Sequence, residues 1–136
     1  MRWFGSSSRS RGQSIVEFSL TLPIFLLLTL GTVEMGWLLY NNHTLSNSTR
    51  EGARHAMVNG ERSENENAIV EVQEIVSEYA SGLSGPVTTT VAPDPIGEPG
   101  TQVTVSASYE YQPIVGMIIG SGSLTLNSES TVIVQY

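Results

Sequence analysis

The sequence has no cysteine and no lysine, and it has only two histidines, His43 and His55. The lack of cysteine excludes disulfide bonds and metal sites built from thiolates. Two histidines are also too few for a site built from imidazoles. We therefore expect no metal ion and no cofactor.

Positive charge is scarce and confined to one end of the chain. All six basic residues are arginines and none lies beyond Arg62, whereas thirteen acidic residues bring the net charge to −7. Proteins that bind nucleic acid need a basic surface to neutralise phosphates. The charge distribution therefore predicts no nucleic acid partner.

Sequence motifs for catalysis are also missing. The chain contains no G-x-S-x-G segment, no P-loop and no dinucleotide fingerprint. Glu71, Glu74 and Glu78 are carboxylates such as any acidic helix offers, and no motif pairs them with a histidine or aromatic residue that would tune them for acid–base work. We expect no catalytic residues and no enzymatic activity.

A long apolar stretch dominates the N-terminal part of the chain. Residues 18–33 are sixteen positions without a charge, and the apolar character continues to Leu39 apart from Glu34. A helix of about 20 such residues crosses a hydrocarbon core of roughly 30 Å. With Glu34 near the outer edge, Trp37 and Tyr40 fall at the interface, where aromatic side chains are enriched. The pattern predicts a transmembrane helix.

The arginines that precede this stretch, Arg2, Arg9 and Arg11, predict its orientation. Basic residues stay in the cytoplasm, so the remainder of a single-pass chain would be extracytoplasmic. We therefore expect the chain in a bacterial cytoplasmic membrane, with its N-terminus inside and its C-terminal domain outside. A secreted soluble protein would instead be cut beyond Tyr40, but the apolar stretch is followed by Asn41-Asn42 and no A-x-A cleavage site.

Glu17 is an acidic residue at the start of the apolar stretch, and two explanations fit it. It lies near water at the membrane boundary, or it belongs to a processing motif. A basic leader, Gly12, four residues, Glu17, then Phe18 and a long apolar run resemble the cleavage site of type IV prepilins and pseudopilins. The resemblance implies cleavage between Gly12 and Gln13. It also implies that Glu17 meets the N-terminal amine of a neighbouring subunit, which would offset the cost of burying either charge alone.

Two further segments resemble the TadE-like family. They are Leu22-Pro23 within the apolar run and the R-E-G-A-R segment from Arg50 to Arg54. The resemblance covers about residues 9–58. It implies a minor pilin or pseudopilin of the tight-adherence, Flp-type pilus. The implied partners are the membrane, a prepilin peptidase, other pilins and pseudopilins, and the inner-membrane assembly platform.

Several roles remain open at this point. Pro23 is either a tolerated kink or a bend that fits a packed bundle. Arg50 and Arg54 are either a solvated pair one helical turn apart or a contact for an acidic partner or lipid headgroups. The alternative function is an uncleaved, membrane-anchored extracytoplasmic binding module.

We expect three segments: a leader over 1–12, a transmembrane or assembly helix with a polar extension over 13–58, and an extracytoplasmic domain over 59–136. The polar run 41–49 has poor helix propensity, so the helix either breaks there or continues to about Val58. Beyond it, Ser63 and Glu66 form a capping box that predicts a helix over 63–83. Its apolar stripe comprises Ile69, Val72, Val76, Tyr79 and Leu83.

Alternating residues then predict strands at about 87–91, 103–111 and 123–136. We expect an α+β fold in which the amphipathic helix covers a small antiparallel sheet of about three strands. Ser128 and Ser130 interrupt the last stripe, where we expect the strand to leave the cover of the helix. The apolar segment 113–120, with Ile114, Met117 and Ile118, either folds under the sheet as core or forms an exposed patch for a partner or the membrane.

Overall fold

The computed structural model describes residues 8–59, 67–94, 96, 99–120 and 122–135. One long helix, α1 (Ser8–Asn59), runs through 52 residues and is about 78 Å long. It continues without a break through residues 41–49, so the prediction of a helix extending to about Val58 is confirmed. Tertiary packing overrides the weak propensity there, because this part of α1 is buried against the rest of the fold.

The second helix, α2 (Asn67–Tyr79), ends four residues before the predicted end at Leu83. The proposed capping box, Ser63 with Glu66, lies outside the described residues. Val72, Val76 and Leu83 are buried as predicted, but Tyr79 is 54% exposed, so its assignment to the core is wrong. Ala80 takes the buried place instead, because the buried positions are spaced by four residues from Val72 onward.

Three antiparallel strands form the sheet in the order β1–β2–β3: β1 (Val87–Ala92), β2 (Gln102–Tyr111) and β3 (Leu124–Ile133). Burial alternates along β2, with the face from Val103 to Tyr111 buried and the face from Gln102 to Glu110 exposed or half-buried. The predicted α+β architecture, with a long N-terminal helix and a three-stranded antiparallel sheet, is confirmed.

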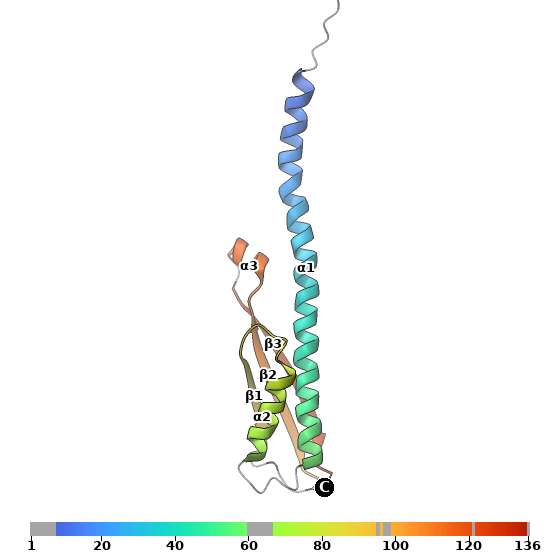
Figure 1. The fold of residues 1–136 in the computed structure, drawn as a ribbon, viewed down its shortest axis with the longest axis vertical. Coiled ribbons are helices and arrows are strands. Elements are labelled where there is room, and N and C mark those ends of the chain that lie inside the picture. Colours follow the sequence, from blue (N-terminus) through green and yellow to red (C-terminus); the bar gives the residue numbers. More distant parts are fainter. Residues whose placement is uncertain (1–7, 60–66, 95, 97–98, 121, 136) are drawn as a thin grey trace, which may run out of the picture.

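The core lies between the sheet and two helices rather than one. The C-terminal half of α1 contacts β2 and β3, and α2 contacts α1 and β1 (Figure 1). Ser128 of β3 is half-buried, and its hydroxyl oxygen lies 2.8 Å from that of Thr49 on α1. At Ser128 the strand is covered by α1 and not by the amphipathic helix α2, whose contacts with the sheet are mainly with β1.

A short helix, α3 (Ile114–Ile119), connects β2 to β3. It ends at Gly120, whose φ of 76° is the left-handed conformation that glycine adopts readily after a helix. α3 lies beyond the end of the sheet, beside the middle of α1 (Figure 1). Ile114, Met117 and Ile118 are 63%, 77% and 69% exposed. The reading of this segment as core under the sheet is wrong, and an exposed apolar patch is what the fold presents.

Candidate assembly and membrane surfaces

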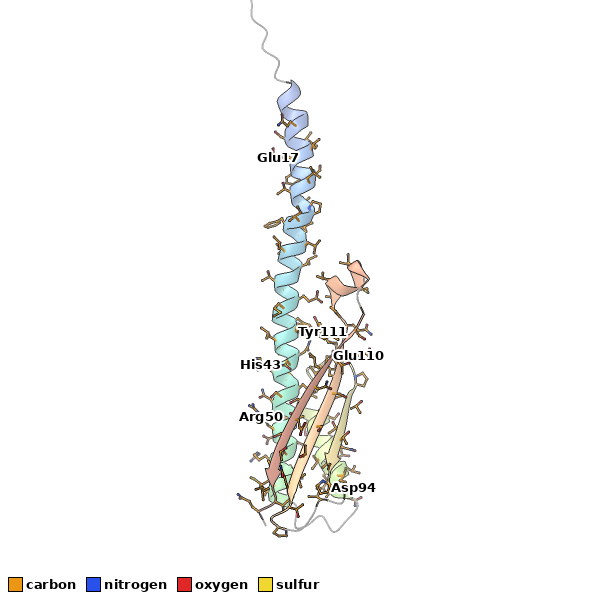
Figure 2. The ribbon with its side chains drawn as sticks, turned by 180° about the vertical axis from the view of Figure 1, so that it is seen from behind. Glu17, His43, Arg50, Asp94, Glu110 and Tyr111 are labelled. Carbon is orange, nitrogen blue, oxygen red and sulfur yellow. The ribbon has the colours of Figure 1, made fainter. Side chains whose placement is uncertain are left out.

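The N-terminal part of α1 projects away from the folded domain. Every residue from Gly12 to Leu30 is exposed, and most of the large side chains are aliphatic or aromatic. α1 is the one helix within the described residues that is long and apolar enough to cross a membrane. Figure 2 shows Glu17 on this projecting part, far from the sheet. The exposed apolar surface of α1 therefore needs either lipid or other helices to cover it.

Gly12 and Gln13, the residues of the expected cleavage site, lie in the first turns of α1, which begins at Ser8. Gly12 has open space around it, with no atom within 4 Å of the place a Cβ would take. A glycine inside a helix costs about 1 kcal/mol relative to alanine. Gly12 therefore lowers the local stability of the helix at the Gly12–Gln13 bond, where a peptidase would have to unwind the helix before it could cut.

Glu17 and Phe18 are neighbours on the exposed surface of α1. Within the part of the chain that the structure describes, the one ion pair joins Arg54 to Glu51, so Glu17 has no intramolecular counter-charge there. An unpaired carboxylate at the edge of an apolar span is costly unless water or a cation reaches it. The geometry leaves Glu17 available to a cation from another molecule.

Pro23 lies inside α1, and the helix continues through it. The hydroxyls in this region donate to backbone carbonyls one turn earlier, at 2.8 Å from Ser19 to Ile15 and from Thr21 to Glu17. These bonds satisfy polar side chains that would otherwise face an apolar medium unpaired. The span is thus compatible with a hydrocarbon environment despite its proline and its hydroxyl groups.

Arg50 and Arg54 lie near the other end of α1. Arg50 is exposed on α1 at the level of the sheet (Figure 2), and Arg54 donates to the carboxylate of Glu51. The hydrogen bond to Glu51, followed by its negative charge, raises the pKa of Arg54. Arg50 lies sixteen positions after Glu34, which is about 24 Å along the helix, and Glu34 is the residue of α1 that binds the start of α3. The arginines and the exposed apolar residues of α3, called the α3 patch below, are therefore two separate surfaces.

The same R-E-G-A-R segment contains a packing site that sequence reasoning missed. A Cβ built on Gly52 would lie 2.5 Å from Val76 Cγ2 on α2. The neighbouring Ala53 is fully buried. Small residues here allow α1 and α2 to approach closely, so the segment serves the fold as well as any partner. The signal available in the sequence was the small-residue pair between two arginines.

Glu34 is the second residue whose role the sequence did not reveal. Its carboxylate accepts hydrogen bonds from the backbone N–H groups of Ile114 and Val115, the latter at 2.8 Å. It also accepts a bond from the Tyr111 hydroxyl at 3.3 Å. Burial, and then the negative charge of Glu34, raise the pKa of Tyr111. No local pattern could show this, because the partners lie about 80 positions away and two of them are backbone groups.

These contacts fix α3 against α1 at a defined level. A cavity of about 310 Å³ separates the two segments, and its lining is mainly apolar. The lining residues are Leu30, Val33, Glu34, Trp37, Tyr111, Ile114 and Val115. Trp37 also packs on Tyr40, with 5.5 Å between ring centroids. The carboxylate of Glu34 thus lies between the apolar part of α1 and its aromatic pair.

The fold and these surfaces define a class: a small α+β domain built onto the end of a long N-terminal helix, whose apolar half is long and apolar enough to cross a membrane. Residues 12–54 match the family model described as TadE-like protein. That segment of the chain is therefore TadE-like, as the sequence predicted. No curated protein and no solved structure matches the chain significantly.

Proposed function

We propose that the chain is a minor pilin or pseudopilin of the tight-adherence pilus, cut by a prepilin peptidase between Gly12 and Gln13. Exposure of the whole segment from Gly12 to Leu30 carries this proposal. A helix that only anchored a domain would need an apolar surface, but it would not need a carboxylate five residues after a glycine, one that has no ion-pair partner among the described residues. In the mature chain Glu17 is the fifth residue.

In the proposed assembly step, Glu17 sets the register, which is the position of one subunit along the next. Cleavage leaves a positively charged amine on Gln13, and the Glu17 carboxylate of one subunit pairs with the amine of the next. Opposite charges at the edge of an apolar bundle compensate each other's desolvation, whereas either one alone is costly. The exposed apolar side chains of α1 then pack with the helices of other pilins. The assembly platform of the inner membrane would be the site where subunits meet.

Cleavage is tested by intact mass and N-terminal sequencing of the membrane-extracted chain, co-expressed with its cognate peptidase. The expected product begins at Gln13. Gly12→Val should block processing, because a β-branched side chain at this position obstructs backbone entry to a peptidase. Gly36→Val, the same change in an equally open position of α1, is the matched control and should be processed normally.

A chain that keeps residues 1–12 in the presence of an active peptidase would contradict the pilin proposal. It would favour the alternative, an uncleaved membrane-anchored binding module. A product that begins beyond Tyr40 and does not associate with membranes would contradict both and indicate a secreted protein. The same experiment thus distinguishes the three classes.

A further inference from the structure

We propose that α3 is a second membrane contact, whose exposed face lies among the acyl chains of the outer leaflet of the membrane that α1 crosses. The proposal goes beyond cleavage and pilus assembly. It rests on α1 being membrane-embedded and holds whether or not the chain is processed.

The first argument is the level of α3 along α1. Taking Phe18 as the first residue inside the hydrocarbon, a core of roughly 30 Å ends about 20 residues later, near Trp37. Glu34 then lies about 24 Å from Phe18, which is about 6 Å inside the outer edge. Because Glu34 binds the backbone of Ile114 and Val115 directly, the start of α3 is held at that same depth.

The second argument is the chemistry of the connection between β2 and β3. No charged residue occurs from Tyr111 to Ser128. The preceding charge, Glu110, accepts a hydrogen bond from the Ser123 hydroxyl at the base of the connection. Met117 and Ile118 are among the most exposed apolar side chains in the described part of the chain. An uncharged tip with a polar base suits insertion into an interface between water and hydrocarbon.

The third argument concerns the backbone of α3. The first N–H groups of a helix have no partner within it, and leaving them unpaired in hydrocarbon costs several kcal/mol each. Glu34 accepts from two of them, at Ile114 and Val115. Met117 N–H donates to Pro113 O at 2.9 Å, and Gly120 N–H donates to Gly116 O. Four N–H groups of this short segment are thus paired, as a backbone that enters lipid requires of its polar groups.

The choice of lipid over a protein partner follows from continuity of the surface. The apolar lining shared by α1 and α3 runs from Leu30 and Val33 to Ile114 and Val115 without a charged group apart from the paired Glu34. The α1 side of that surface faces acyl chains if α1 crosses the membrane. Lipid that covers one wall of the shared surface therefore also reaches the other.

Depth-dependent fluorescence quenching tests the proposal on the full chain. Because the sequence has no cysteine, Met117→Cys gives a unique site for an environment-sensitive dye. Met117 is exposed, so the change does not disturb the core. Leu28→Cys on α1 marks the hydrocarbon, and Asp94→Cys marks water, since Asp94 lies at the end of the sheet away from α3 (Figure 2). The variants are placed in phosphatidylethanolamine and phosphatidylglycerol vesicles at low protein density, with no other pilus protein.

Lipids that carry a quencher on the acyl chain should quench the dye at position 117 several times more than the dye at 94. The shallow quencher should be the more effective one at 117. If position 28 is quenched but 117 behaves like 94, α3 stays in water and the proposal is overturned while the membrane anchor stands. If the dye at position 117 is shielded from water only when another pilin is added, the proposal is also overturned, in favour of a protein partner. If the dye at position 28 is not quenched either, α1 is not embedded in the membrane and the proposal loses its premise.

Discussion

Gly52 on α1 lies against Val76 on α2 so closely that an added Cβ would be 2.5 Å from the Val76 methyl carbon Cγ2. Carbon atoms in packed interiors are ordinarily separated by about 3.5 to 4.0 Å. The absence of a side chain at Gly52 is therefore what allows the two helices to meet. α2 reaches its place on the sheet through this contact, because Val76 is fully buried at the interface.

We predict that Gly52→Ala lowers the free energy of unfolding of the domain by about 0 to 2 kcal/mol. Overpacking costs about 1 to 3 kcal/mol, and the gain in helix propensity returns about 1 kcal/mol. Thermal unfolding of the full chain in detergent measures the change. Gly36→Ala gains the same propensity in open space, so it isolates the steric effect.

The double variant Gly52→Ala with Val76→Ala identifies the contact responsible. Removing the Val76 methyl groups frees the space that the new Cβ requires. The two changes together should therefore cost less than the sum of their separate effects, with a coupling of about 0.5 to 3 kcal/mol. Additive effects would show that Gly52 acts through some other contact.

A second prediction concerns the attachment of α3. In Glu34→Ala, the N–H groups of Ile114 and Val115 lose their acceptor. Hydrogen bonds to charged groups contribute about 1.5 to 3 kcal/mol each and are not additive. Amide exchange at these two positions, measured by mass spectrometry in lipid nanodiscs, should accelerate by roughly ten- to a hundredfold.

Glu34→Gln provides the matched control, since its amide retains one acceptor oxygen. Exchange in this variant should fall between those of the wild type and Glu34→Ala. The amides of β2 near Val103, which pair within the sheet, should be unchanged in both variants. Unchanged exchange at Ile114 and Val115 in Glu34→Ala would mean that the carboxylate does not hold α3.

The strands were predictable because their side chains alternate. From Val103 to Tyr111 every second residue is buried, which is the pattern the sequence displays. The apolar anchor was equally clear from its length and lack of charge. Both features are local, so each can be recognised within one stretch of the sequence.

The packing face of α1 could not be recognised in the same way. Its buried residues include Asn41, Ser48 and Thr49 together with Gly52 and Ala53, which are small or polar. Hydrophobic periodicity identifies faces that are rich in large apolar residues, and this face is defined by close approach instead. The sequence therefore indicated a polar extension where the structure has part of the core.

The α3 patch and Glu34 show a second limit. The six residues of α3 are too few to display a helical period, so the sequence predicted an apolar loop over 113–120. Glu34 read as an acid near the membrane edge, with no assigned role. Its function depends on backbone groups brought to it by the β2–β3 connection, and only the tertiary structure supplies that information.

A third prediction follows from the raised pKa of Tyr111. A tyrosine whose pKa is higher in the folded than in the unfolded state contributes stability that is fully present below its unfolded pKa, near 10. That contribution is lost as the pH rises through the higher folded value. Tyrosinate absorbance should therefore show a late-ionising group that disappears in Tyr111→Phe, and the alkaline fall in stability should become shallower. Tyr79→Phe, which removes an exposed tyrosine, is the control; a titration curve that Tyr111→Phe leaves unchanged at its alkaline end would contradict the assignment.

A fourth prediction separates processing from assembly. Glu17→Ala should leave cleavage after Gly12 intact, because the scissile bond lies five residues away, and it should reduce incorporation into pili by removing the counter-charge for the new amine. Immunoblots of membrane and sheared-pilus fractions measure the two quantities together. Ser19→Ala, which removes a polar group without changing the charge on the same exposed part of α1, should incorporate normally. Normal incorporation of Glu17→Ala would remove the register role and leave the cleavage proposal in place.

The last prediction concerns Asn41, whose side chain is fully buried on α1. Within the described residues, neither its amide nitrogen nor its carbonyl oxygen has a hydrogen-bond partner. A buried polar group without a partner costs about 1 to 3 kcal/mol, so Asn41→Leu should raise the unfolding free energy of the isolated subunit by about that amount. Thermal unfolding in detergent checks this, and Asn42→Leu, at the adjacent exposed position, should change stability by less than about 0.5 kcal/mol. A destabilised Asn41→Leu would contradict this prediction.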